Sequence, residues 1–127
     1  MQYSEIIKQV QTAAQIDDKE KAQKAIQATL ETLKERIIGD EASNLAAQLP
    51  EEIGQHLRGR EGKNGQYFSL QEFYERVGKV EGVDSTAAAA HVKGVFSVLN
   101  SAVSAGEFDN IKNDLPDDYR ELFAAAS

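Results

Sequence analysis

The chain has 127 residues, of which 41% are hydrophobic and 28% are charged, which is the composition of an ordinary globular protein and too apolar for a disordered one. Its net charge of −7 disfavours nucleic acid as a partner, because the overall field would repel a phosphate backbone. The lack of cysteine excludes disulfides, thiolate metal sites and thiol catalysis. With no leader-like N-terminus and no window of roughly 18 apolar residues, we expect a cytoplasmic protein without a membrane partner.

Two helices are predicted in the first 37 residues. Ser4 can cap a helix over residues 4–16, and Asp17 with Glu20 resembles a capping box that begins a longer helix. The apolar side chains of this longer helix repeat at intervals of four and three: Ala22, Ile26, Leu30, Leu33 and Ile37. Its charged residues, which include Lys34, Glu35 and Arg36, are interpreted as a solvated face.

Two shorter helices and a connector follow. Gly39 suits the left-handed residue that ends a helix, and Asp40 can cap the next one. Because the residue before proline avoids the α region, the third helix is predicted to end at Leu49 and the fourth to begin at Pro50. Residues 58–66 contain three glycines, an Asn-Gly turn signal and no apolar side chain, which predicts a mobile connector.

The second half of the chain resembles the first. Gly106–Phe123 nearly copies Asp40–Leu57, 66 residues upstream, including Leu-Pro followed by two acidic residues. The helix after Asp84 carries an apolar stripe that repeats the stripe of the second helix 66 residues later: Ala88, Val92, Phe96, Leu99 and Val103. Ser69 and Glu72 form a capping box that begins a separate, preceding helix, whose apolar residues are Phe73, Tyr74, Val77 and Val80.

The sequence therefore predicts a single all-α domain over residues 1–127, a helical bundle of about eight helices built as two pseudo-symmetric four-helix repeats, residues 1–57 and 67–127. Each short helix is expected to bury its stripe against the long helix of its own repeat. The two long helices should be central. The last four residues, 124–127, are expected to fray.

Several short motifs point to a family. Phe68–Val77 precedes a Gly-Val-Asp turn at Gly82–Asp84, and an alanine-rich helix, Gly106–Phe108 and Asp114–Asp118 follow. This combination resembles the bacterial domain of unknown function 2267 family over nearly the whole chain. The resemblance implies a small all-helical bacterial domain with no established activity, so no functional residue can be transferred from it.

No group of residues in the sequence predicts catalysis. There is no GxSxG motif and no phosphate-binding loop, and the acidic pairs lie at predicted helix starts, where capping explains them. His56 has Glu52 one turn before it but lacks a third metal ligand. We therefore expect no enzyme activity, no metal and no cofactor.

The prediction for function is a non-catalytic module that binds another protein or regulates one, as a monomer or weak homodimer. The alternative is a small-molecule binder that uses an aromatic-lined interface between the two repeats. Candidate contact residues are His91, Tyr74, Tyr67, Arg58 and Arg60. Each also has a plain structural explanation, namely a histidine satisfied at the core margin, ordinary aromatic packing and a solubilising connector.

Overall fold

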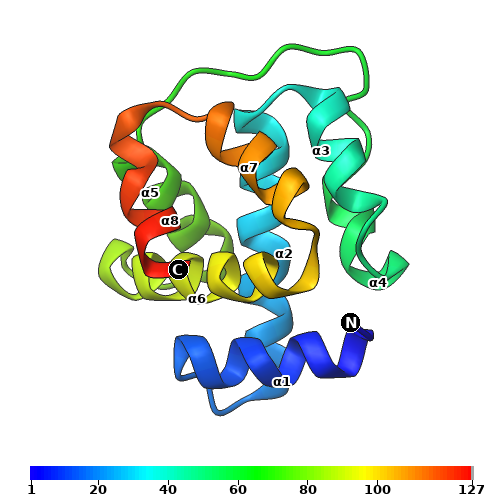
Figure 1. Cartoon of the computed structure of the whole chain (residues 1–127). Helices are drawn as coiled ribbons and strands as arrows, with labels where there is room; N and C mark the ends of the chain where they lie inside the picture. Colours follow the sequence, from blue (N-terminus) through cyan, green and yellow to red (C-terminus); the bar gives the residue numbers. More distant parts are fainter. Residues whose placement is uncertain (127) are drawn as a thin grey trace.

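The computed structural model describes residues 1–126, and within them every regular element is a helix (Figure 1). Eight α-helices and two short 3₁₀ helices occur in this range: α1 (Tyr3–Ala14), α2 (Lys19–Arg36), α3 (Gly39–Ala46), α4 (Glu51–Gly54), η1 (Gln55–Leu57), α5 (Leu70–Glu81), α6 (Ser85–Ala102), α7 (Ala105–Asn113), η2 (Asp117–Tyr119) and α8 (Arg120–Ala126). The predicted fold class is thus confirmed as all-α. None of the described helices combines the length and apolar character needed to span a membrane.

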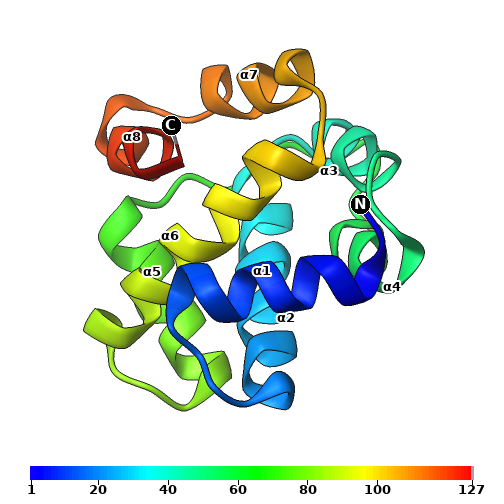
Figure 2. The same ribbon diagram turned by 60° about the horizontal axis from the view of Figure 1, so that its bottom comes forward.

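The long helices α2 and α6 lie at the centre, as predicted, because most other helices pack against one or both of them. Figure 1 shows α1 crossing α2, and Figure 2 shows it lying across both long helices. Helix α1 packs on α2, the long helix of its own half, but its most extensive packing is on α6, so the expectation that each short helix packs on the long helix of its own half holds only in part for α1. A β-carbon at Gly94 would lie 2.7 Å from that of Ala14, so this crossing depends on the missing side chain of Gly94.

The core is filled by apolar stripes that meet at these crossings. Leu33 of α2 and Phe96 of α6 are both 0% exposed. Phe73 and Tyr119 are equally buried, and their rings meet edge to face with centroids 5.9 Å apart. Such edge-to-face pairs contribute beyond the burial of their area, so the aromatic residues of the second half help to define the core.

Two predicted N-terminal caps are shifted. Helix α1 begins at Tyr3 after Gln2, which makes no side-chain capping bond, so Ser4 is not the cap. Helix α2 is capped by Asp18, whose carboxylate accepts a hydrogen bond from the main-chain nitrogen of Glu20, and not by Asp17. In contrast, Ser69 accepts from the Glu72 nitrogen at 3.1 Å, as predicted.

The predictions around α3 and α4 are also corrected. Gly39 does not end a helix in the left-handed region; it is the first, buried residue of α3. Helix α3 ends at Ala46 instead of Leu49, because residues 47–49 form a turn. Pro50 is the residue before α4, where its fixed backbone angle directs the chain into the helix. Helix α8 continues to Ala126, past the predicted start of fraying, and Ser127 lies outside the described residues.

The connector, residues 58–66, is bound to the α2–α3 junction. The Gly39 nitrogen donates to the Lys63 carbonyl at 2.9 Å, and the Gln66 nitrogen donates to the Glu35 carbonyl at 2.8 Å. The Asp40 carboxylate, which was predicted to cap α3, accepts from the Gly62 nitrogen at 2.8 Å. Main-chain hydrogen bonds thus fix a segment whose composition predicted mobility.

The turn after α1 offers a direct test of backbone strain. Gln15 has φ 55° and is the only non-glycine residue in the left-handed region within the described chain, whereas Gly82 occupies the same place after α5 with φ 76°. We expect Gln15→Gly to raise the free energy of unfolding by about 0.5–1 kcal/mol, because glycine adopts this conformation without steric cost. Urea denaturation measures the effect. Gly82→Gln is the matched reverse change and should lower stability by a similar amount; stabilisation by both would contradict the argument.

Candidate functional site

A cleft of about 540 Å³ lies between the α1–α2 turn and the α5–α6 turn, and we call it the turn cleft. Ile16 and Val83, one from each turn, give it apolar walls. Lys21 and Lys24 line it from α2, and His91 lines it from α6. The cleft therefore combines apolar surface with a few convergent polar groups, which is typical of ligand sites.

A contact between His91 and Glu81 forms the polar end of the turn cleft. His91 Nδ1 lies 2.7 Å from Glu81 Oε1, and the side chain of Glu81 is only 5% exposed. Burial raises the pKa of Glu81, although the hydrogen bond and charge of His91 act in the opposite direction. The second oxygen, Oε2, is sealed from solvent without a hydrogen-bond partner. This carboxylate is consequently left with one unsatisfied acceptor.

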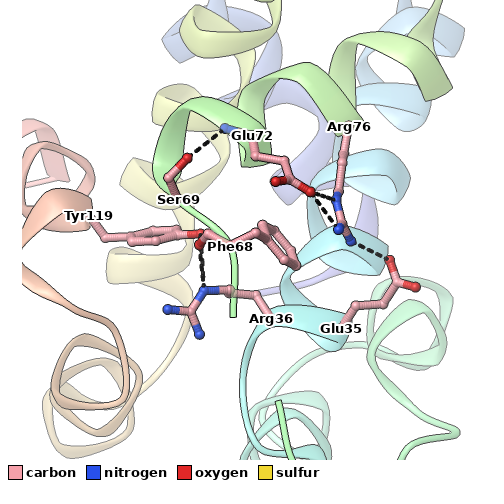
Figure 3. Close-up of polar contacts among 7 residues, drawn as sticks. All are labelled: Glu35, Arg36, Phe68, Ser69, Glu72, Arg76 and Tyr119. Carbon is pink, nitrogen blue, oxygen red and sulfur yellow. Dashed lines mark hydrogen bonds and ion pairs between the residues drawn. The ribbon is translucent and has the colours of Figure 1, made fainter. Parts of the chain in front are cut away.

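A second concentration of polar contacts, the arginine cluster, consists of Arg36, Tyr67, Phe68 and Tyr119. Arg36 Nε donates to the Phe68 carbonyl at 2.9 Å and contacts the Tyr119 hydroxyl at 3.2 Å (Figure 3). That hydroxyl donates to the same carbonyl at 2.7 Å. Arg36 is only 6% exposed, so its interpretation as part of a solvated face is wrong. Burial raises the pKa of Tyr119 to about 12, despite the charge of Arg36, and keeps its hydroxyl protonated as a donor.

The match to known protein families covers almost the whole chain. Residues 3–122 fit the model of a family described as an uncharacterized conserved protein, DUF2267. The chain belongs to this family. The resemblance that Phe68–Val77 and Asp114–Asp118 indicated is thereby confirmed. No curated protein matches this DUF2267 chain, so the roles of its residues rest on the geometry alone.

The five residues singled out in the DUF2267 sequence lie in separate places. His91 lines the turn cleft, whereas the Tyr74 hydroxyl donates to Glu121 at 2.7 Å, and burial raises the pKa of Tyr74 above its usual range. Tyr67 is 82% exposed and belongs to the arginine cluster. The remaining two residues lie on the connector: Arg58, which pairs with Glu51 at 3.4 Å, and Arg60, which donates to the Asn64 carbonyl at 2.8 Å.

The aromatic side chains of the second half do not line the turn cleft. Phe73, Phe96 and Tyr119 are buried and pack against one another, and Phe96 also meets Phe123 at a centroid distance of 5.8 Å. Sequence reasoning missed Glu81 and Arg36, the two buried charged residues at these sites. Nothing in the spacing of these residues distinguishes them from the charged residues that stay exposed, because only the crossing of distant helices buries them.

A pair of carboxyl groups, half-buried Glu41 of α3 and buried Glu107 of α7, was also absent from the sequence prediction. Glu107 is 8% exposed. Burial, followed by a hydrogen bond to Glu41 and the charge of that residue, raises the pKa of Glu107 to about 7. One oxygen of each residue is sealed without a hydrogen-bond partner. The α3–α7 contact therefore favours a protonated Glu107.

This pair predicts a pH-dependent stability. The folded-state pKa of Glu107 lies above its ordinary value of 4.5, so its contribution is complete below about pH 4.5 and is lost as the pH rises through about 7. Glu107→Gln should remove this loss and raise the free energy of unfolding at pH 8 by about 1–2 kcal/mol relative to the unmodified chain. Urea denaturation at pH 5 and pH 8 measures it. Glu75→Gln, at an exposed position on α5, is the control, and equal pH dependence of all three proteins would refute the prediction.

Proposed function

We propose that this chain is a non-catalytic binding module that recognises another protein through the surface around Tyr67. The observation that carries the proposal is the 82% exposed ring of Tyr67, which lies 5.0 Å from the guanidinium carbon of Arg36. Tyrosine and arginine are enriched among the residues that dominate binding energy at protein interfaces. Ile38, two residues after Arg36 in the chain, is also exposed, at 47%.

We further propose that the chain consists of two pseudo-symmetric copies. Two reciprocal contacts between α3 and α7 support this: the Ser104 nitrogen donates to Gln48 Oε1 at 2.7 Å, and the Ile38 nitrogen donates to Asp114 Oδ2 at 3.1 Å. Both donors and both acceptors correspond at the 66-residue offset of the sequence repeat. Glu41 and Glu107 obey the same offset.

The surface grooves also support a duplication. One groove lies between α2 and α5 and contains Thr32 and Lys79, and another lies between α6 and α1 and contains Val98 and Thr12. Corresponding residues therefore line corresponding grooves, each formed by the long helix of one half and the first helix of the other. In each groove the first helix of one half packs on the long helix of the other half. This arrangement buries within one chain the interface that a dimer of single copies would use, so sedimentation equilibrium should give a monomer.

Crosslinking from position 67 tests the protein-binding proposal. Tyr67 is replaced by the photoreactive amino acid p-benzoylphenylalanine, which keeps an aromatic ring there, and the chain is irradiated in its source cells. We expect one discrete adduct of higher mass, identified by mass spectrometry, because a specific partner presents the same surface each time. Excess unlabelled chain should compete for this adduct.

The same photoreactive residue at Lys19 is the matched control, because Lys19 is exposed at the start of α2, outside the arginine cluster. This position should not yield the adduct. Identical adducts from both positions, or none from position 67, would contradict a partner site at Tyr67.

A second candidate function is the binding of a small molecule in the turn cleft. The apolar walls of the cleft and its convergent polar side chains, His91 among them, favour it, because such a lining is typical of ligand sites. Native mass spectrometry of the gently isolated chain should then show an added mass that Glu81→Gln weakens. Glu52→Gln, at an exposed carboxylate on α4, is the control, and a bare 13.9 kDa species would remove the basis for a tightly bound ligand.

A further inference from the structure

Arg36 is a buried cation that pairs with no carboxylate among the described residues. With 6% of its surface exposed, it is far more enclosed than the other arginines that form ion pairs, such as Arg76 and Arg58. Buried charged side chains are normally paired, since an isolated buried charge is costly. No ion pair of Arg36 lies within 4.0 Å among the described residues.

The acidic residues around the arginine cluster have other partners. Glu35 and Glu72 both contact Arg76, at 4.0 and 2.6 Å respectively. Asp118 accepts a hydrogen bond from the Leu70 nitrogen at 2.9 Å. The positive charge of Arg36 is therefore offset by the Phe68 carbonyl and by the faces of the rings of Tyr67 and Tyr119, at 5.0 and 5.1 Å.

Within the part of the chain that the structure describes, only one of the three guanidinium nitrogens of Arg36 makes a hydrogen bond. Nε makes both hydrogen bonds, whereas the two Nη atoms have no hydrogen-bond partner in the described chain. They are not among its sealed, unpartnered atoms, so they retain contact with solvent. Figure 3 shows these nitrogens pointing away from Glu35 and Arg76. Since the Nε bonds and the ring contacts hold the guanidinium in place, its outer edge is a preorganised pair of donors.

We propose that this outer edge of Arg36 binds a carboxylate group of the partner, with the exposed ring of Tyr67 covering the contact. The proposal rests on the protein-binding function proposed above. A guanidinium donates two parallel hydrogen bonds to a carboxylate, and such charge-assisted pairs are strong where water is excluded. Phosphate has similar geometry but carries more negative charge. A single cation does not balance this charge, and the net charge of −7 of the chain repels it. The C-terminal carboxylate of a partner chain and the carboxylate of an aspartate or glutamate side chain can each accept these two hydrogen bonds.

The test follows the guanidinium resonances of the folded full-length chain by ¹⁵N NMR during titration with sodium acetate. Sodium chloride maintains the ionic strength. We expect a saturable shift of the Arg36 Nε and Nη signals in the millimolar range, and small, non-saturating shifts at Arg58. A parallel titration uses inorganic phosphate. Equal, linear shifts at both arginines would overturn the proposal, and so would saturation by phosphate without saturation by acetate.

Two variants define the site. Tyr67→Ser removes a ring that is 82% exposed, so the fold should persist while acetate binding weakens by about threefold, the effect of losing one cation–π contact. Arg58→Ser is the control and should leave the Arg36 titration unchanged. Equal titrations of Tyr67→Ser and the unmodified chain would overturn the role of the ring.

The source of the carboxylate is distinguished with two probes, N-acetylalanine for a main-chain terminus and N-acetylglutamic acid α-amide for a side chain. Either supports the proposal if it saturates Arg36, and the tighter one identifies the source. Saturation by acetate without a crosslinked protein at position 67 would support the anion site and refute the protein-binding function. A specific crosslink at position 67 without saturation of Arg36 would support the protein-binding function and refute the carboxylate site.

Discussion

Phe96→Ala is expected to lower the free energy of unfolding by about 3–5 kcal/mol, the usual cost of truncating a fully buried phenylalanine. The side chain is 0% exposed at the centre of α6. Its ring meets Phe73 and Phe123 edge to face, at centroid distances of 6.5 and 5.8 Å. Removing it leaves a cavity where α5, α6 and α8 meet, and two aromatic contacts are lost as well.

Urea denaturation followed by circular dichroism measures this change. Val80→Ala on α5 is a useful control, because Val80 is 42% exposed and its truncation should cost less than about 0.5 kcal/mol. Leu33→Ala, at the equally buried position on α2, should cost about 2–5 kcal/mol. Unchanged unfolding of Phe96→Ala would show that α6 is not central to the core.

Gly39→Ala is expected to lower the free energy of unfolding by more than about 2 kcal/mol, an unusually large effect for one added methyl group. A β-carbon at this position would lie 1.6 Å from the Arg60 carbonyl oxygen, where no atom fits. The connector would have to move, and the hydrogen bond from the Gly39 nitrogen to the Lys63 carbonyl would be lost. The backbone of Gly39 is not left-handed, so steric overlap is the cause.

Gly106→Ala is the matched control for this variant. Gly106 lies in the first turn of α7, and a β-carbon there would have no neighbouring atom within 4 Å. Alanine should therefore stabilise the helix by up to about 1 kcal/mol, because it loses less backbone entropy than glycine. A loss of stability in Gly39→Ala together with a gain in Gly106→Ala would show that the connector packs against Gly39. Destabilisation of both variants by a similar amount would contradict this packing.

The two candidate sites depend on different residues. The turn cleft depends on Glu81 and His91, which lie in contact at 2.7 Å, and the arginine cluster depends on Arg36 and Tyr67. Glu81→Gln should therefore leave the acetate titration of Arg36 unchanged. Likewise, Tyr67→Ser should leave any ligand of the turn cleft in place. These crossed controls separate the protein-binding proposal from the small-molecule alternative.

The positions of the helices were predictable because their signals are local. Apolar residues at intervals of three and four, together with capping residues such as Ser69, indicate where a helix runs and which face it buries. Leu33 and Phe96 were accordingly predicted as core residues, and both are fully buried. The errors at Asp17, Gly39 and Leu49 are displacements of one to three residues, at helix ends where several residues compete for the same capping role.

The sequence by itself determined that the chain forms helices, which stripes face inward and to which family it belongs. Only the tertiary structure decided that α1 lies on α6, that the connector is fixed by main-chain hydrogen bonds, and that Arg36, Glu81 and Glu107 are enclosed. The physical reason is that a helical stripe depends on neighbouring residues. The burial of a charged side chain depends instead on which distant helix crosses over it. The spacing of residues along one helix does not indicate where that crossing occurs.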